Sequence, residues 1–311
     1  MFDVIAIGEL LIDFAPVSVD GEGYPTVAAN PGGAPANYLA ALSKFGKSTA
    51  LIGKVGNDAF GKLLLNTLET VGISTRGMIV DDESFTTLAF VTLDDKGDRE
   101  FSFARKPGAD TRISAEEVDK LMLNETKVLH FGTLSLTDEP ARSATYEAVR
   151  YAKERGKLIS FDPNLRRPLW KSMEEAKKQM LWGLEQADVI KISDEEVDFL
   201  FALDPVAGAE HILSAYGAKL VFVTCGADGC YCANHSSRIK VPGLSGLKVV
   251  DTTGAGDIFG GSAMYKLLEI GKDPSELKSD ELEQVCSFAV RMSGLSVTTS
   301  GAIPSIPDKD E

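Results

Sequence analysis

Short runs of apolar and β-branched residues alternate with longer amphipathic stretches along most of this chain, and that order restricts its fold more than any other feature. The runs that predict strands are Val4–Gly8, Ala50–Gly53, Lys127–Gly132, Lys157–Phe161, Val189–Ile192 and Leu220–Thr224. The stretches that predict helices are Pro35–Phe45, Ala59–Thr70, Glu139–Arg155, Met173–Gln186 and Val206–Tyr216. Helices of this length can return the chain so that successive strands run parallel. We therefore expect an α/β fold with helices on both faces of the sheet, and a ligand site beyond the carboxyl ends of the strands.

Two regions interrupt this alternation and predict a second, smaller β-sheet. Residues 13–30 show no helical period, and residues 86–104 contain two apolar runs joined by the polar turn "DDKGD", which is typical of a hairpin. We interpret about 13–30 and 86–110 as one small sheet on a single domain of residues 1–311, placed to cover a cleft as a lid. The alternative is an ordinary extension of the edge of the main sheet. An exposed small sheet is also a surface through which two copies of the chain could form a homodimer.

Composition and charge restrict the partners of the chain. Of its 311 residues, 44% are hydrophobic and 25% are charged, which is typical of a soluble globular protein. No segment approaches the roughly 20 apolar residues that span a bilayer, and "MFDVIAIGEL" has the pattern of a first strand rather than of a secretion signal, so we expect a cytoplasmic protein. The net charge of −14 disfavours nucleic acids and anionic membranes as partners but does not exclude small phosphate ligands. The four cysteines lack the spacing of a zinc ribbon and are expected to be reduced thiols.

The segment "VVDTTGAGDIFGG", residues 249–261, combines flexible backbone with two acids. Gly254 and Gly256 allow a tight turn with uncovered N–H groups, and the helical pattern that follows ends near Gly271. The start of this helix is therefore a predicted anion site. Asp257 beside it is either a general base that accepts a hydroxyl proton or an N-cap residue, and the local pattern does not separate the two. The glycine spacing is neither that of Walker A nor that of the dinucleotide fingerprint.

Two motifs identify a family resemblance. The segment "DTTGAGDIFGG" resembles the second signature of the ribokinase-like (pfkB-type) carbohydrate kinases, and "PGGAPANYLAALSKFG", residues 31–46, resembles their first signature. The resemblance covers nearly the whole chain. Within the family, "GELLIDF", "SFDPNLRRPLW" and "KISDEEVDFL" are most similar to fructokinases. The resemblance implies a three-layer αβα sandwich with a small β-sheet lid, and ATP-dependent phosphorylation of fructose to fructose 6-phosphate.

The resemblance also implies roles for individual residues around the transferred phosphoryl group and the sugar. Asp257 corresponds to the catalytic base, and the N–H groups of the preceding loop correspond to an anion hole formed by Gly254, Ala255 and Gly256. The positions that match sugar-binding residues are Asp13, Gly32, Gly33, Asn37 and Arg105. Arg105 belongs to "RKPGAD", in which Lys106 replaces the Asn of the fructokinase pattern "RNPGAD".

Further positions match nucleotide and metal sites of the family. Nucleotide contacts are implied for Asn164, Arg166, Ser193, Glu196, Thr224, Gly226 and Gly229. Glu196 would also hold Mg²⁺ through water, although Ser193 replaces the Asn of the usual N-x-x-E motif. Arg166 could equally form a surface ion pair. A monovalent cation, which we expect to be K⁺, is implied beside the anion hole at Asp251, Thr253, Ser296, Thr299, Gly301 and Ser305.

Features of the sequence bear on four alternatives to the fructokinase hypothesis. Another kinase of the same family, acting on 2-keto-3-deoxygluconate, ribose or a nucleoside, is the nearest alternative, because Gly32, Gly33 and Asn37 do not distinguish these substrates. A fructose-6-phosphate kinase is disfavoured, since the sequence shows no clear extra basic cluster for a second phosphate. A catalytically inactive binding protein would be expected to lack Asp257 or the glycine loop, and both are present. A dinucleotide-dependent oxidoreductase would need a phosphate fingerprint after the first strand, and "IGELLID" does not supply one.

Overall fold

The computed structural model describes residues 1–93 and 99–311, and within them the main sheet has nine strands in the order β13-β12-β11-β10-β9-β8-β1-β4-β5. Their bounds are β1 Phe2–Ile7, β4 Thr49–Gly56, β5 Ile73–Asp81, β8 Thr126–Gly132, β9 Leu158–Asp162, β10 Val189–Ser193, β11 Leu220–Thr224, β12 Cys230–Asn234 and β13 Arg238–Val241. The seven neighbouring strands β11, β10, β9, β8, β1, β4 and β5 pair in parallel, as predicted. The last two pair antiparallel, because a short turn returns β11 directly into β12.

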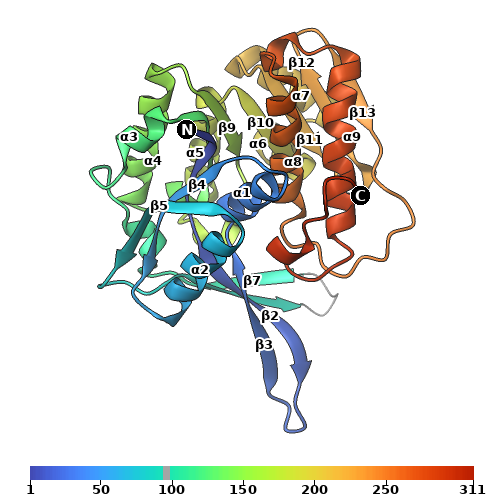
Figure 1. Ribbon diagram of the computed structural model, residues 1–311. Helices are drawn as coiled ribbons and strands as arrows, with labels where there is room; N and C mark the ends of the chain where they lie inside the picture. Colours follow the sequence, from blue (N-terminus) through green and yellow to red (C-terminus); the bar gives the residue numbers. More distant parts are fainter. Residues whose placement is uncertain (94–98) are drawn as a thin grey trace.

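Helices cover both faces of this sheet and make three layers (Figure 1). Their bounds are α1 Ala34–Lys44, α2 Ala59–Thr70, α3 Lys120–Asn124, α4 Ala141–Glu154, α5 Met173–Gln186, α6 Asp194–Phe201, α7 Pro205–Tyr216, α8 Ala255–Ile270 and α9 Ser279–Ser296. Alternate residues of β1 point to opposite faces: Val4 packs in a core with α1, α8 and α9, whereas Ile5 packs with α4, α5 and α7. This is the expected arrangement of a doubly covered parallel sheet.

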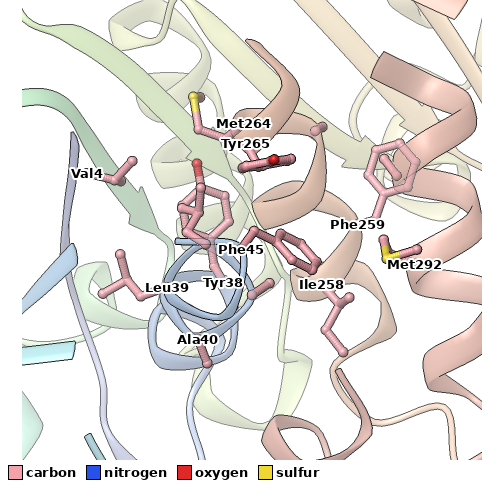
Figure 2. Close-up of a cluster of buried hydrophobic side chains, with 14 of the residues drawn as sticks. Val4, Tyr38, Leu39, Ala40, Phe45, Ile258, Phe259, Met264, Tyr265 and Met292 are labelled. Atoms are coloured by element: carbon pink, nitrogen blue, oxygen red, sulfur yellow. The ribbon is translucent and has the colours of Figure 1, made fainter. Parts of the chain in front are cut away.

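The core between α1 and α8 places the first and second signature segments side by side. Figure 2 shows Tyr38 and Phe45 packed close to Ile258 and Tyr265. Gly261 permits this close approach, because a Cβ there would lie 2.5 Å from the backbone oxygen of Tyr38. Two segments more than two hundred residues apart in the sequence thus become neighbours, and the start of each helix faces the carboxyl edge of the sheet.

The small sheet has the order β3-β2-β6-β7, with β2 Leu11–Val19, β3 Pro25–Gly32, β6 Leu88–Leu93 and β7 Arg99–Ala104. It is a sheet of its own rather than an extension of the main sheet, and the hairpin of β2 and β3 projects away from the body (Figure 1). The antiparallel pairing of β6 with β7 confirms the predicted hairpin strands, whereas the turn "DDKGD" lies outside the described residues. The β2–β3 hairpin follows β1 directly and leads directly into α1, whereas β6 and β7 join the small sheet later in the chain, after β5.

Two further expectations concern the helices and the cysteines. Among the described residues, no helix combines the length and the apolar character needed to cross a membrane. All four cysteines are free, and Cys230, Cys232 and Cys286 are buried in the core. This arrangement is consistent with the expected reduced thiols.

Candidate active site

A cleft of about 270 Å³ lies at the carboxyl edge of the main sheet, below the small sheet. Its walls include the β1–β2 connection, strands β2 and β7 of the small sheet, the start of α1, the segments after β8 and β9, Lys191 of β10, and the start of α8. Its polar lining residues are Glu9, Asp13, Asn37, Asn164, Arg166, Lys191, Thr252, Thr253 and Asp257. Parallel strands that end at one edge bring these distant residues together, as expected for an α/β sheet.

The loop "TTGAGD" forms the floor of this cleft and leads into α8. Gly254 is the N-cap residue and has φ 77°, a left-handed conformation that favours glycine. Ala255 donates its N–H to the carbonyl of Thr252 at 3.3 Å, whereas the amides of Gly256 and Asp257 lie in the first helical turn, where no helical carbonyl precedes them. The loop thus presents backbone amides and the positive end of the α8 dipole to the cleft.

The carboxylate of Asp257 is held by two side-chain amides. Asn37 donates to Oδ2 at 2.8 Å and Asn164 donates to Oδ1 at 3.1 Å. Burial raises the pKa of Asp257, and the amide of Asn37 together with the charges of Lys191 and Arg166 opposes that rise. Because Gly254 is the N-cap, Asp257 does not have the capping role that the sequence left open. Its fixed orientation and raised pKa suit a group that accepts a proton.

Asn164 reaches Asp257 through an unusual backbone conformation. Its φ is 46°, and its N–H is held by Asp162 Oδ1 at 3.2 Å. Asn adopts the left-handed region more readily than other non-glycine residues, because its short polar side chain can form hydrogen bonds close by. This turn directs the Asn164 amide to Asp257.

Lys191, which sequence reasoning missed, is the buried cation of this cleft. It lies on β10, and its Nζ is 3.0 Å from Asp162 Oδ2. A Cβ at Gly256 would lie 3.0 Å from this Nζ, so the ammonium group sits against the anion-site loop. Burial lowers the pKa of Lys191, but the carboxylates of Asp162, Glu196 and Asp257 outweigh it and raise the pKa overall. Its signal in the sequence was a single charge within the apolar strand "VIKIS".

A second cavity of about 420 Å³ adjoins the first and is lined mainly by apolar side chains and glycines. Thr252 and Gly256 line both cavities, so the loop before α8 is their common wall. Three of the predicted nucleotide residues, Thr224, Gly226 and Gly229, line this second cavity. Its apolar character fits a flat aromatic base, and its junction with the first cavity lies at the anion site.

The other predicted nucleotide residues lie elsewhere. Asn164 and Arg166 line the first cavity rather than the second. Ser193 and Glu196 line neither of the two, because they form the capping box of α6: Ser193 Oγ accepts the Glu196 N–H at 3.2 Å, and Glu196 Oε2 accepts the Ser193 N–H at 2.9 Å. Glu196 Oε1 also accepts the Leu165 N–H at 2.7 Å. Glu196 thus fixes the strand-end loop that carries Asn164 and Arg166.

Three of the five predicted sugar-binding residues line the first cavity, and two do not. Asp13, Gly33 and Asn37 line the first cavity. Gly32 makes room for Asp13, because a Cβ there would lie 2.2 Å from Asp13 Oδ2. Arg105 does not line this cavity: its side chain is buried, with Nε 2.8 Å from Asp110 and a second nitrogen 2.9 Å from the Leu134 carbonyl. Its role in sugar binding stays a prediction.

The predicted cation residues meet beside the same loop. Asp251 joins the two segments, because Oδ1 accepts the Thr253 N–H at 2.7 Å and Oδ2 accepts the Gly301 N–H at 3.0 Å. The hydroxyl groups of Ser296 and Ser305 donate to the carbonyls of Ser293 and Ala302 at 2.7 and 2.8 Å. Thr299 donates its N–H to the Ser296 carbonyl at 3.2 Å. In the described part of the chain no three His, Cys, Asp or Glu residues gather into a metal site, so oxygen atoms from the backbone and hydroxyl groups would have to supply most ligands here.

The left-handed glycine at the start of α8 gives a first testable prediction. In Gly254→Ala, a Cβ would lie 2.4 Å from the Cβ of Ala302 and would have to adopt a φ of 77°. We expect the free energy of unfolding to fall by about 2–4 kcal/mol from the combined strain and overlap. Gly271→Ala is a matched control, because it has φ 69° at the other end of the same helix with open space around the added atom.

Chemical denaturation of the two variants checks this prediction. Gly271→Ala should lose only the conformational part, about 1 kcal/mol. Equal destabilisation of the two variants would show that the contact with Ala302 is unimportant.

Comparison with known proteins agrees with this geometry. Residues 1–309 match the family described as pfkB family carbohydrate kinase. The chain is 40% identical over 313 residues to fructokinase-1 of Zea mays, covering 99% of this chain and 95% of the relative. A fructokinase from Xylella fastidiosa solved with bound ATP superposes with a TM-score of 0.89 at 30% identity, covering 99% of this chain and 96% of that one.

A second solved structure is a double mutant of a fructokinase from Vibrio cholerae O395, in a form bound to fructose, ADP and potassium ion. It has a TM-score of 0.86 at 31% identity and covers 98% of this chain and 96% of that one. The family match, the full-length relatives and the ribokinase-like α/β fold lead to one assignment. The chain belongs to the pfkB family of carbohydrate kinases.

Proposed function

We propose that this chain is an ATP-dependent fructokinase, which converts D-fructose and ATP into D-fructose 6-phosphate and ADP. One observation carries the proposal: the cavity that holds Asp257 and the apolar cavity beside it share the loop that begins α8, through Thr252 and Gly256. A sugar in the first cavity and a nucleotide in the second would therefore meet at this loop. The carboxylate of Asp257 lies on the sugar side of the meeting point.

The residues of this junction supply the chemistry of in-line phosphoryl transfer. Asp257 accepts the proton of the attacking primary hydroxyl while the new O–P bond forms and the bond from the γ-phosphorus to the ADP oxygen breaks. The charge of the transferring group is met by the amides at the start of α8 and by the ammonium group of Lys191. Arg166 lines the same cleft, and its charge lowers the pKa of Asp257.

The charged groups behind the cleft fit a magnesium ion that is held indirectly. Both oxygens of Glu196 accept backbone N–H groups, and Asp162 holds Lys191 and Asn164. Burial raises the pKa of Asp162 to about 7, and the charge of Lys191 opposes that rise and favours the carboxylate. Mg²⁺ usually keeps several waters and binds substrate phosphates, so such acids suit an indirect contact. When bound, Mg²⁺ would neutralise charge on the transferring phosphates. Asp162 and Glu196 would hold it through water.

A potassium ion is proposed at the predicted monovalent site. Asp251 accepts hydrogen bonds from Thr253 and Gly301 and so connects residues 251–253 with residues 299–301 beside Gly254. This arrangement places a carboxylate and backbone carbonyls close to the anion-site loop. Such oxygens suit a hard cation. An ion there would fix the shape of the loop rather than touch the sugar.

Fructose is proposed as the acceptor because the curated relatives at about 40% identity are named fructokinases, and because the Vibrio cholerae structure contains fructose. A second phosphate on the sugar is disfavoured. The cationic side chains that line the first cavity in the described structure, Arg166 and Lys191, both act on Asp257 at the phosphoryl end of the cleft. The opposite end is lined by Asp13 and Glu9, which would repel a phosphate.

The small sheet is proposed to act as a lid and as a dimer contact. Leu11, Asp13 and Phe103 line the cleft from this sheet. Its projecting hairpin exposes apolar side chains, with Val19 67% exposed and Tyr24 65% exposed. Such residues suit pairing with a second copy. The cytoplasmic location remains an expectation from the sequence.

A phosphorylation screen tests this function. Purified enzyme is given ATP and Mg²⁺ with fructose, ribose, 2-keto-3-deoxygluconate, adenosine or fructose 6-phosphate, each with K⁺ and with Na⁺. We expect kcat/KM for fructose to exceed that for every other acceptor by at least about tenfold, and the rate to be higher in K⁺. A clear preference for another acceptor would contradict the fructose assignment, and equal rates in the two salts would contradict the potassium site.

A further inference from the structure

We propose that Glu9 is a sugar-binding residue whose carboxylate accepts a hydroxyl hydrogen bond in the cleft, so that its ionisation controls sugar affinity. This inference rests on the proposed function, because it assigns the first cavity to the sugar. Glu9 lies within the segment "GELLIDF", but the sequence assigned it no role in the site.

Glu9 occupies the turn between β1 and β2 and lines the first cavity together with Asp13 and Asn37. Only 2% of its surface is exposed. Its backbone is fixed by a close approach to Gly33, where a Cβ would lie 2.6 Å from the Glu9 carbonyl oxygen. A carboxyl group held this firmly on the wall of a polar cleft is suited to bind a ligand there.

One oxygen of Glu9 is already used within the protein. Oε1 accepts the Ala34 N–H at 2.9 Å, at the start of α1, where the first turn contains no acid of its own. A carboxylate offers about four acceptor positions. The Glu9 carboxyl also accepts a hydrogen bond from its own backbone N–H. These two bonds orient the group and leave further acceptor positions, which we propose receive a sugar hydroxyl in the cavity that Glu9 lines.

Charged groups around Glu9 determine its ionisation. Its pKa is raised to about 7: burial is the main cause and the charge of Asp110 adds to it, while the backbone N–H groups of Glu9 and Ala34 and the charge of Arg105 oppose the rise. Arg105 and Asp110 form a buried ion pair of 2.7 Å in the segment after β7. Across the cavity Glu9 faces the acids Asp13 and Asp257 and the cations Arg166 and Lys191.

The sign of the expected effect follows from this pKa. Above about pH 7 Glu9 is ionised, and a charged acceptor forms a stronger hydrogen bond than a neutral acid. A bound sugar hydroxyl should therefore favour the ionised form. The dissociation constant for fructose should fall by roughly fivefold between pH 6 and pH 8, since charge assistance strengthens one hydrogen bond by about that factor.

Equilibrium binding of fructose, measured by calorimetry from pH 5.5 to pH 8.5, tests the inference in wild type, Glu9→Gln and Glu283→Gln. Glu9→Gln keeps an oxygen for the Ala34 N–H but cannot ionise, so its fructose affinity should vary less with pH than that of wild type and should resemble the low-pH value of wild type. Asp257, which lines the same cavity with a raised pKa, accounts for any dependence that the two proteins share. Glu283→Gln is a control, because this exposed residue of α9 lies outside the cleft. It should keep the wild-type pH dependence.

A wild-type affinity that does not change with pH, or a pH dependence in Glu9→Gln as large as that of wild type, would overturn the role of Glu9 and leave the kinase assignment intact. If Glu9 only caps α1, the substitution would alter thermal stability but not the pH dependence of fructose binding. If wild type binds no fructose, the fructose assignment fails separately, and the same titration is run with the sugar that the screen identifies. Failure of every sugar would overturn both proposals.

Discussion

Replacement of Asp257 by Asn should lower kcat by at least about 10²-fold, the lower range for the loss of a positioned general base. The amide cannot take the hydroxyl proton, and its NH₂ group would face one of the two amide donors, Asn37 or Asn164, that now hold the carboxylate. The KM values should change much less than kcat, because the groups that line the rest of the cleft remain. Steady-state kinetics of the purified variant measure this effect.

The pH dependence of turnover gives a second measurement on the same variant. Burial raises the pKa of Asp257, so wild-type activity should decrease as pH falls through that raised value and the carboxylate becomes protonated. The variant should lack this part of the decrease. Asp280→Asn is the matched control, because Asp280 lies in the first turn of α9 as Asp257 lies in the first turn of α8, but it is exposed and remote from the cleft. Near-normal turnover in Asp257→Asn would refute the assignment of the base.

Replacement of Lys191 by Met should lower kcat by about 10²–10³-fold, the usual effect of removing one group that stabilises transition-state charge in an enclosed site. The ammonium group lies against Gly256, where the transferring phosphoryl group is proposed to pass. Its charge also opposes the rise in the pKa of Asp257. In the variant this opposition is lost, so the decrease in kcat/KM at low pH should begin at a higher pH than in wild type.

A second buried lysine provides the control for Lys191. Lys54 on β4 is also buried and paired, with Nζ 2.7 Å from Glu117, but it lies outside the cleft. Removal of one partner from a buried pair destabilises a protein by about 3–5 kcal/mol, so both variants should be less stable. Only Lys191→Met should lose turnover per folded molecule and shift the pH profile. Equal kinetic losses in the two variants would mean that Lys191 is only a structural residue.

The fold was largely predictable because its signals are local. Each predicted strand and helix coincides with an observed element within a few residues, since apolar periodicity and β-branched runs act over short stretches. β5 was not predicted, because this edge strand alternates buried and exposed residues irregularly. α9 was also missed, although Asp280 and Glu281 in its first turn are typical of a helix start.

The site was only partly predictable because much of it depends on pairing between distant segments. The family resemblance implied Asn37 as a sugar ligand, which stays a prediction, but the sequence did not show that its amide also donates to Asp257, 220 positions further along the chain. Ser193 and Glu196 have a second explanation that the sequence does contain, since S-x-x-E is a capping box. Glu9 and Lys191 lie in the quoted segments "GELLIDF" and "KISDEEVDFL", but their roles could not be assigned, because a charge beside an apolar strand has no defined partner until the sheet is assembled.

The chain passes directly from β1 into β2 and from β3 into α1. The proposed lid is therefore continuous with the segments that line the acceptor cavity. Asp13 is a residue of the small sheet itself, and Gly32 ends the strand that leads to Asn37. Any tilt of that sheet against the body therefore displaces the groups that hold the acceptor. If the small sheet is the lid proposed above, an acceptor bound at Asp13 would hold it over the cleft, and transfer of the phosphoryl group to water would be suppressed until an acceptor is in place.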